Sequence, residues 1–530
     1  MIAFVQLDGS SLTLDDLAAV ARQGVEVRLA DSARDAMQRS HEWVQRAARG
    51  ELRDGDDQPL AVYGVNTGYG SLSRVRIDDA QIARLSWNLV RSHAAGVGPS
   101  LPLDFVRAMM LLRANALAKG VSGIRPVVVE RLLQMLNAGV TPIVPARGSC
   151  GSSGDLAPLA HLGLVLFRDP NGESCGSAVY QGEVLPSGEA MRRAGLEQLV
   201  PGPKDGLAVT NGAQLTCAIT ALACWDTVRL IHQAEVAAAL SWEALCGVSR
   251  ALNASVQEHR PYPGAIDCAS DLRRLLEGST LVDSVPDKVQ DAYSLRCTPQ
   301  VLGAVRDGVR YAIDQVRVEL NAVTDNPLIL VDEPGENKAF SAGMFHGEPV
   351  GFAADHLRLS LCELGSLAER RLYRLTTGVL SGNLPPLLSS GAGLGFGLPQ
   401  TAAAALVAEN RQLAFPASVD SIPTCEDQED HVAMSTTAAR RSATVLVNAR
   451  RIVAIELLAA HTALRIRKDE GYTLGHGTEA AFRAMEALVG SEQQTASEQI
   501  RCVELALAEG RLLHQVQAAI GPMAEVARGA

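Results

Sequence analysis

The chain has 530 residues, of which 47% are hydrophobic, 20% are charged and only 4% are aromatic. This balance is typical of a soluble globular protein and excludes a disordered or fibrous one. The formal net charge is −11 and no basic stripe is present, so we expect no nucleic-acid partner. No segment holds about 18 uncharged apolar residues, so we expect no membrane span. Alanine and leucine supply much of the apolar content, which favours an all-α fold.

The N-terminal stretch and the cysteines bear on the cellular compartment. No basic segment precedes an apolar run in the first 16 residues, so we expect a cytoplasmic protein without a secretory signal. The ten cysteines are scattered, without the paired short spacings of zinc or redox sites. We therefore expect free thiols, mostly buried, and no metal site.

Residues 10–50 predict two short helices, because apolar side chains recur every three to four residues. The second of these helices begins at Asp31 and ends near Gly50. From there to about residue 200, helices alternate with glycine-rich loops such as GVNTGYGS, GVGPSLP and PARGSCGSSGD. Functional sites concentrate in loops that rigid helices carry, so these loops are candidates for a site.

The second half of the chain predicts long helices with few breakers. They lie around 208–249, 299–322, 349–377, 398–413 and 430–468, and two further amphipathic helices follow residue 477. Stretches such as AAAALVAEN are apolar nearly all round, which indicates helices buried in a bundle or in an oligomer. A homo-oligomer with a large helical interface is therefore expected.

The stretch PARGSCGSSGDLAPLAHL, residues 145–162, is the most informative part of the chain. Small residues and glycines predict a sharp bend directly before a helix that Asp155 caps. A simple helix entry is one interpretation, because Ser, Gly and Asp commonly precede helices.

Eight separated motifs favour a more specific interpretation. They are VYGVNTGYG (62–70), NLVRSHAAGVG (88–98), GSSGDLAPLAH (151–161), TNGAQ (210–214), QDAYSLRCTPQVLGA (290–304), ELNAVTDNP (319–327), FHGEPV (345–350) and VDSIPTCEDQEDHVAM (419–434). In this order, and over nearly the whole chain, they resemble the family of histidine and aromatic amino-acid ammonia-lyases, which includes aminomutases. The resemblance is strongest to the histidine branch.

This resemblance implies that Ser152, Ser153 and Gly154 form a 4-methylidene-imidazol-5-one ring, with no diffusible cofactor. The nitrogen of Gly154 attacks the carbonyl of Ser152, and loss of water turns Ser153 into a dehydroalanine. Glycine suits the attacking position because it has no side chain to obstruct the approach. Family members usually have alanine at position 152, so Ser152 adds a hydroxyl beside the electrophile.

The same motifs imply the other catalytic and substrate-binding residues. Tyr63 matches the base that removes the β-proton, although a phenol must have its pKa lowered from about 10 to act near neutral pH. Arg296 matches the anchor of the substrate carboxylate, which a guanidinium fork can bind with two hydrogen bonds. The remaining matches are Tyr293 as a further catalytic residue, and Asn211, Gln290, Phe345 and Gln428 as substrate-binding residues.

Two residues resemble the histidine branch in particular. His93 matches the residue that meets the substrate imidazole, and Glu429 matches a carboxylate at the far wall, which we also count as catalytic. Together they offer hydrogen-bond partners to a ring with two nitrogens, whereas a phenyl ring would leave them unpaired. A core histidine and a surface salt bridge would be the purely structural interpretation.

Other positions depart from the histidine branch. Tyr69, Ala213 and Met344 stand where it commonly has phenylalanine, threonine and asparagine. The substrate could therefore be another amino acid such as tyrosine or phenylalanine, and the reaction could be that of a 2,3-aminomutase. A helical scaffold that does not form the ring is a third alternative.

The expected fold is all-α, an elongated subunit with a central bundle of long helices that resembles the ammonia-lyase (fumarase/aspartase-like) fold. Residues 1–205 are expected to carry the ring-forming loop and the Tyr63 loop, and residues 206–530 the long-helix bundle and the C-terminal helices. The resemblance further implies a homotetramer with shared active sites and a small amino acid as substrate. The favoured reaction is L-histidine to trans-urocanate and ammonia.

Overall fold

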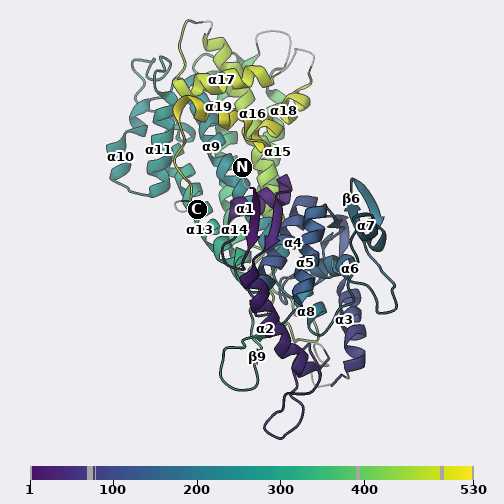
Figure 1. The fold of residues 1–530 in the computed structure, drawn as a ribbon. Helices are drawn as coiled ribbons and strands as arrows, with labels where there is room; N and C mark the ends of the chain where they lie inside the picture. Colours follow the sequence, from purple (N-terminus) through teal and green to yellow (C-terminus); the bar gives the residue numbers. More distant parts are fainter. Residues whose placement is uncertain are drawn as a thin grey trace. The chain divides into compact units, whose positions relative to one another are not determined.

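The computed structural model describes residues 3–68, 76–77, 79–389, 394–468, 470–489 and 494–527. Helices make up most of this part of the chain, and the strands are short (Figure 1), which confirms the predicted helical class. In the described residues no helix combines the length and the apolar character that crossing a bilayer requires. The predicted cytoplasmic location stays a prediction.

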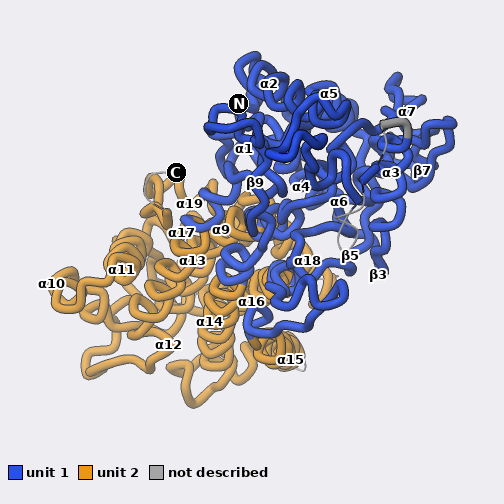
Figure 2. The backbone as a smooth tube through the Cα atoms, turned by 90° about the horizontal axis from the view of Figure 1, so that it is seen from below, with its two compact units in different colours: residues 1–222, 314–354, 416–440 blue, residues 223–313, 355–415, 441–530 orange. Residues whose placement is uncertain are grey.

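The chain forms two compact units, coloured in Figure 2, each of which is made of several segments. Unit 1 comprises residues 1–222, 314–354 and 416–440, and unit 2 comprises residues 223–313, 355–415 and 441–530. The predicted division of the chain after residue 205 stays a prediction.

Short helices and small sheets alternate along the first part of the chain. The helices are α1 (Leu14–Ala18), continued by the π-helix η1 (Ala19–Gln23), α2 (Asp31–Ala48), α3 (Asp79–His93), α4 (Leu103–Ala118), α5 (Pro126–Ala138), α6 (Leu156–Leu166), α7 (Ser187–Arg193) and α8 (Asp205–Thr210). Helix α2 begins at Asp31 as predicted and ends two residues before Gly50.

The strands pair in four small sheets. Strand β1 (Phe4–Leu7) pairs in parallel with β2 (Glu26–Leu29), and the antiparallel pairs are β3 (Val97–Ser100) with β5 (Pro145–Arg147), β4 (Thr141–Pro142) with β6 (Ser177–Tyr180), β6 with β7 (Glu183–Pro186), and β8 (Leu328–Ile329) with β9 (Ala339–Phe340). The β3–β5 pair places two of the predicted glycine-rich loops side by side.

The predicted long helices are present, with ends that differ by up to six residues. They are α9 (Gln214–Ala244), α13 (Thr298–Leu320), α14 (Glu348–Thr376), α15 (Gly397–Leu413) and α16 (Ser435–Lys468). Helices α9 and α16 bury most of their side chains, as their apolar sequences predict. Helix α15 differs, because Pro399, Ala403, Val407 and Asn410 are its buried residues in the single chain.

The remaining helices lie in unit 2 and are short. They are η3 (Ser249–Leu252), α10 (Ala254–Glu258), α11 (Pro263–Leu276), α12 (Tyr293–Arg296), η4 (Gly378–Leu380), η5 (Pro386–Leu388), α17 (His476–Leu488), α18 (Ala496–Ala508) and α19 (Arg511–Ile520). Helices α17, α18 and α19 pack on one another. The prediction of two helices after residue 477 was wrong, because Gly510 adopts a left-handed conformation and separates α18 from α19.

No disulfide joins the ten cysteines, all of which lie in the described part of the chain. The prediction that they are mostly buried was wrong, since four are buried, five are half-buried and Cys425 is exposed. Three of the residues that are not fully buried, Cys150, Cys297 and Cys425, lie within the sequence motifs described above.

Candidate active site

Ser152, Ser153 and Gly154 lie on the loop that joins β5 to α6. Ser152 and Gly154 are buried and Ser153 is half-buried. Gly154 has a φ of 71°, a conformation that residues with a side chain rarely adopt. A Cβ atom at this position would also overlap the backbone carbonyl of Gly212. Only glycine fits here, and the same residue type is the one that ring closure requires at its nitrogen.

The buried carboxylate of Asp155 fixes the end of this loop. It accepts hydrogen bonds from Ser149 Oγ at 2.9 Å, from Thr216 N at 2.8 Å and from Thr436 Oγ1 at 2.6 Å. Burial raises the pKa of Asp155, and these hydrogen bonds oppose the rise. Asp155 occupies the predicted cap position of α6, but its side chain forms no capping bond there. It instead joins segments that are distant in the sequence.

The carbonyl of Ser153 faces a buried amide. With its amide oriented to satisfy both polar atoms, Asn211 donates from Nδ2 to Ser153 O at 3.0 Å and accepts from Asn326 N at 2.9 Å. Arg113 Nη1 in turn donates to the backbone carbonyl of Asn211 at 2.5 Å. This donor on the Ser153 carbonyl and the glycine at 154 both fit a cyclised tripeptide.

A buried ion pair supports the segment that holds Asn326. Lys204 Nζ donates to Asp325 Oδ2 at 2.8 Å and to Asn326 O at 3.3 Å. Neither charged side chain is exposed to solvent. Burial lowers the pKa of Lys204, and the charge of Asp325 opposes this change. A buried charge that loses its partner is strongly destabilising, so each member of the pair depends on the other.

We expect Lys204→Met to lower the free energy of unfolding by about 3–5 kcal/mol, because the buried carboxylate of Asp325 then loses its ion-pair partner. Chemical denaturation measures the change. The double variant Lys204→Met, Asp325→Asn should be less destabilised than Lys204→Met alone. Lys119→Met, which removes an exposed lysine that donates to Asn321 O at 2.8 Å, is the control and should change stability by under about 1 kcal/mol. Equal losses in both single variants would contradict the role of the buried pair.

The carboxylate of Glu429 accepts hydroxyl hydrogen bonds from both serines of the tripeptide. Ser152 Oγ donates to Oε2 at 2.7 Å, and Ser153 Oγ donates to Oε1. Thr424 Oγ1 adds a second donor to Oε2 at 2.5 Å. The motifs predicted Glu429 at the far wall of the pocket, whereas here it lies directly against Ser152 and Ser153.

Thr424 was not predicted, and its position depends on an unusual loop. The backbones of Thr424 and Glu429 bond to each other in both directions, at 3.0 and 3.3 Å. Between them, Cys425, Glu426 and Asp427 have φ angles of 53°, 56° and 60°. Left-handed residues with side chains cost on the order of 1–2 kcal/mol each. No sequence pattern predicts three in succession, so only the folded chain brings the Thr424 hydroxyl to Glu429.

The charge states of Glu429 and His93 are coupled. Burial raises the pKa of Glu429, but hydrogen bonds from Ser153 and three other side chains outweigh this and place it below its ordinary value. Burial lowers the pKa of His93, while a backbone hydrogen bond and the charge of Glu429 oppose the decrease. His93 is the last residue of α3 and is half-buried, with Ser92 Oγ 3.1 Å from its Nδ1. The charge of Glu429 therefore favours the protonated form of His93, against the effect of burial.

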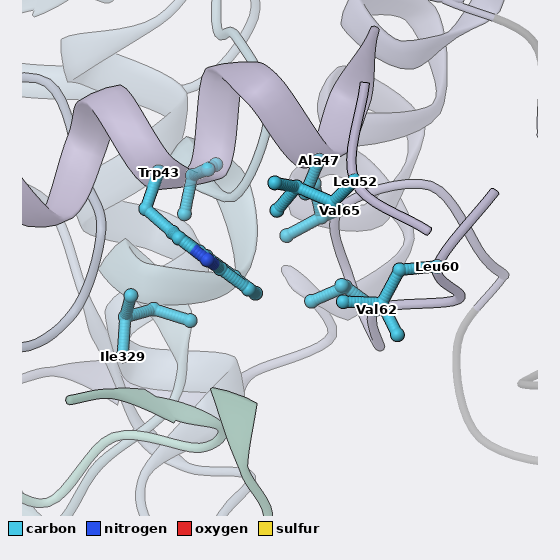
Figure 3. Close-up of a cluster of buried hydrophobic side chains, with 8 residues drawn as sticks. Trp43, Ala47, Leu52, Leu60, Val62, Val65 and Ile329 are labelled. Carbon is cyan, nitrogen blue, oxygen red and sulfur yellow. The ribbon is translucent and has the colours of Figure 1, made fainter. Parts of the chain in front are cut away.

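Tyr63 lies half-buried on a turn that the hydrophobic core anchors on both sides. Val62 and Val65 belong to a buried cluster with Trp43 (Figure 3). The amide of Asn66 closes the turn by accepting from Val62 N at 2.8 Å and donating to the carbonyls of two preceding segments. The backbone on either side of Tyr63 is thereby fixed. Tyr69 belongs to the same motif, two residues after Thr67, and lies outside the described residues.

Other predicted residues of unit 1 lie on loops near the ends of long helices. Phe345 is half-buried, Met344 is 47% exposed and Gln428 is exposed, whereas Ala213 is buried at the start of α9. Gly347 N donates to Gly151 O at 3.0 Å, which ties the loop that carries Phe345 to the ring-forming loop. The roles of Phe345 and Gln428 in the site stay predictions.

Three predicted residues lie in unit 2. Gln290 and Tyr293 are exposed, and Arg296 is half-buried. The guanidinium of Arg296 lies over the ring of Tyr293, 4.7 Å from its centroid, and its Nε donates to Asp291 O at 2.8 Å. Tyr293 is 70% exposed, which is unusual for so large a side chain. Their predicted roles in the active site also stay predictions.

Two groups of side chains in the described part of the chain have the residue types that bind metal ions. In His232, Glu235 and Asp271, the guanidinium of Arg306 already bridges both carboxylates, with contacts of 2.7 Å. In His346, Glu348 and His431, the two imidazole rings are parallel within 3°, with centroids 5.8 Å apart. In each group the candidate ligand atoms lie within 4.8 Å of one another.

Comparison with known proteins agrees with this geometry. A model of the aromatic amino acid lyase family matches residues 12–487. A histidine ammonia-lyase from Alkaliphilus oremlandii is 44% identical over 92% of this chain and 93% of its own. Among solved structures, tyrosine aminomutase from Streptomyces globisporus aligns with a TM-score of 0.89 at 34% identity, over 98% of this chain and 99% of that one. Histidine ammonia-lyase from Trypanosoma cruzi aligns with a TM-score of 0.87 at 35% identity, over 97% and 95%.

The chain therefore belongs to the aromatic amino acid lyase family, and it is a carbon–nitrogen lyase. Its helical fold is the one shared by the ammonia-lyases and aminomutases in the solved structures. The resemblance inferred from eight motifs is confirmed over most of the chain.

Proposed function

We propose that this enzyme eliminates ammonia from L-histidine to give trans-urocanate, using a 4-methylidene-imidazol-5-one ring formed from Ser152, Ser153 and Gly154 and no diffusible cofactor. The relative named histidine ammonia-lyase, at 44% identity, supports this choice. The observation that carries it is the carboxylate of Glu429, which lies against the tripeptide and accepts hydrogen bonds from both Ser152 and Ser153.

The packing around the tripeptide favours ring closure. Gly154 offers an unobstructed nitrogen, and Asp155 N donates to Gly212 O at 2.7 Å, which fixes the backbone directly after it. Asn211 donates to the Ser153 carbonyl, the oxygen that the closed ring retains. When present, the ring supplies an electrophilic carbon for the amino group of the substrate. Every other contribution comes from side chains that bind, orient or deprotonate the substrate.

Glu429 and His93 provide the selectivity for an imidazole. The carboxylate accepts a hydrogen bond from a ring N–H, and His93 offers a partner to the other ring nitrogen. A phenyl ring offers no hydrogen bond to either of these half-buried groups, whereas an imidazole can bond to both. This difference favours histidine over phenylalanine.

Deprotonation and carboxylate binding are assigned to residues outside this cluster. Tyr63 is the proposed base for the β-proton, and Arg296 is the proposed anchor for the substrate carboxylate. We place them in a homotetramer with shared active sites. In such an assembly, exposed residues such as Tyr293 and Gln290 are available to an active site of a neighbouring chain.

A 2,3-aminomutase is the second candidate, because the chain aligns with a tyrosine aminomutase at a TM-score of 0.89. An aminomutase returns ammonia to the β-carbon, and the same electrophile and base serve both reactions. Purified enzyme incubated separately with L-histidine, L-tyrosine and L-phenylalanine decides between them. Urocanate as the sole product supports the proposal. A β-amino acid, or a conjugated acid from another substrate alone, overturns it.

Glu429→Gln is expected to lower kcat/KM for histidine by about tenfold to a hundredfold, because a charge-assisted hydrogen bond to the imidazole is lost. Residual activity on phenylalanine should fall far less. Steady-state kinetics on both substrates measures the ratio of kcat/KM for histidine to kcat/KM for phenylalanine. Asp430→Asn, which removes the neighbouring exposed carboxylate, is the matched control and should leave the ratio unchanged. Equal losses on both substrates in Glu429→Gln would refute imidazole recognition by this residue.

A further inference from the structure

The two oxygens of the Glu429 carboxylate differ in what ring formation does to their partners. Oε1 accepts from Ser153, while Oε2 accepts from Ser152 at 2.7 Å and from Thr424 at 2.5 Å. Dehydration of Ser153 removes its hydroxyl as water. The hydroxyls of Ser152 and Thr424 take no part in that reaction. After ring closure Oε2 keeps both of its hydroxyl donors and Oε1 loses the hydroxyl of Ser153, while the Cys425 thiol remains a further hydrogen-bond partner of the carboxylate.

We propose that Ser152 is a positioning residue, which together with Thr424 holds Oε2 of Glu429 and leaves Oε1 open to a ring N–H of the substrate. This inference rests on the proposed function. It assigns a role to the residue at which the chain departs from the alanine usual in the family. It also explains how a carboxylate beside the electrophile keeps one orientation after its contact with Ser153 is gone.

The donors on Oε2 are themselves fixed. Ser152 is 7% exposed, and the preceding residue, Gly151, accepts from Gly347 N at 3.0 Å and donates to Ser149 Oγ at 3.1 Å. Thr424 is held by its two backbone hydrogen bonds to Glu429. Hydrogen bonds to an ionised group are the strong ones, and two of them, one from the loop of Ser152 and one from the loop of Glu429 itself, restrain Oε2. One oxygen is thus held by two hydroxyls.

The pH dependence has a definite sign. The hydrogen bonds of Ser153, Thr424 and Ser152 lower the pKa of Glu429 against the effect of burial. Removing the Ser152 hydroxyl therefore raises that pKa, so the carboxylate becomes protonated at a higher pH. The other titratable groups that interact with it are His93 from α3, Cys150 from the ring-forming loop and Cys425 from its own loop. All three remain unchanged in a Ser152 variant.

Ligand binding without turnover tests the proposal. The probes are imidazole-4-propionate, which has the ring and the carboxylate but no amine to eliminate, and 3-phenylpropionate, which lacks the ring nitrogens. Calorimetry over a pH series gives both dissociation constants. For Ser152→Ala, we expect imidazole-4-propionate to bind about tenfold more weakly. The fall in its affinity at low pH should begin at a higher pH than in the wild-type enzyme. Binding of 3-phenylpropionate should not change. The probe itself titrates in the same way with every protein, so a difference in pH dependence between variants comes from the protein.

Three further variants and one mass measurement complete the experiment. Thr424→Val removes the other hydroxyl from Oε2 and should act in the same direction, while Ser152→Thr keeps a hydroxyl and should restore binding. Ser421→Ala is the matched control, since its hydroxyl accepts from Val432 N at 3.0 Å and does not contact Glu429. The intact mass of unfolded Ser152→Ala should show the loss of two waters, because only the backbone carbonyl of residue 152 enters the ring.

The outcomes separate this inference from the proposed function. One outcome is that the wild-type enzyme prefers imidazole-4-propionate while Ser152→Ala binds this probe with the same affinity and the same pH dependence. In that case only the positioning role is overturned. The same holds if Ser152→Ala fails to lose two waters, since the hydroxyl would then serve cyclisation. If the wild-type enzyme binds both probes equally, recognition of histidine by Glu429 fails first, and the positioning role with it.

Discussion

Replacing Ser153 with alanine is expected to leave a folded protein with no measurable ammonia-lyase activity. The alanine has no hydroxyl to eliminate, so the proposed ring cannot form. We expect activity to fall on the order of 10³-fold or more, the scale seen when a group that acts in the chemical step is removed. The variant should fold, because the recorded side-chain contact of Ser153 is the one with Glu429. Urocanate formation and the intact mass of the unfolded chain are the two measurements.

The wild-type chain should be lighter than its sequence by two waters, and Ser153→Ala should show the full sequence mass. Ser152→Ala is the matched control, with the same atom removed one residue earlier and the ring retained. A wild-type chain at full sequence mass would exclude the ring and favour the helical scaffold. Activity in Ser153→Ala close to that of the wild type would exclude the electrophile.

Tyr63→Phe should lower kcat by about 10²–10⁴-fold, the usual contribution of a general base. The loss should be confined to chemistry, because the neighbouring Val62 and Val65 remain in the buried cluster of Figure 3 and Asn66 still closes the turn. Thermal unfolding and the loss of two waters should match the wild type. Single-turnover kinetics with histidine measures the chemical step.

Tyr180→Phe serves as the control for this variant. Tyr180 lies on β6, and its hydroxyl accepts from Gln181 on the protein surface at 3.4 Å. Its removal should leave kcat unchanged. Near-normal turnover in Tyr63→Phe would refute the role of this residue as base and would transfer that role to another group.

Most of the helical fold could be predicted because helix formation depends on local sequence. The apolar spacing of α2 and its start at Asp31 are local signals, and the long helices follow from runs without breakers. The small sheets could not be predicted in this way. Strands β4 and β8 have two residues each, and their pairing depends on segments far away in the chain.

The site was predicted unevenly for the same reason. The tripeptide and Glu429 were found through motifs, and the structure brings them together. Thr424 was missed because only the left-handed loop after it turns its hydroxyl to Glu429. The cap role of Asp155 was half right, since its position is local but its partners are not. Residue type alone could not show which hydroxyls converge on one carboxylate.

The anchoring of Asp155 has a consequence for the timing of the chemistry. Its carboxylate joins Ser149 to Thr436, which lies 281 positions after Asp155 in the chain. Asp155 therefore has all of its hydrogen-bond partners only after a distant C-terminal segment has been synthesised and packed. A nascent or misfolded chain would contain an ordinary Ser-Ser-Gly sequence, inert toward cellular amines and thiols. On the proposed ring chemistry, completion of folding is the step that creates the reactive group, which confines a strong electrophile to molecules already able to shield it.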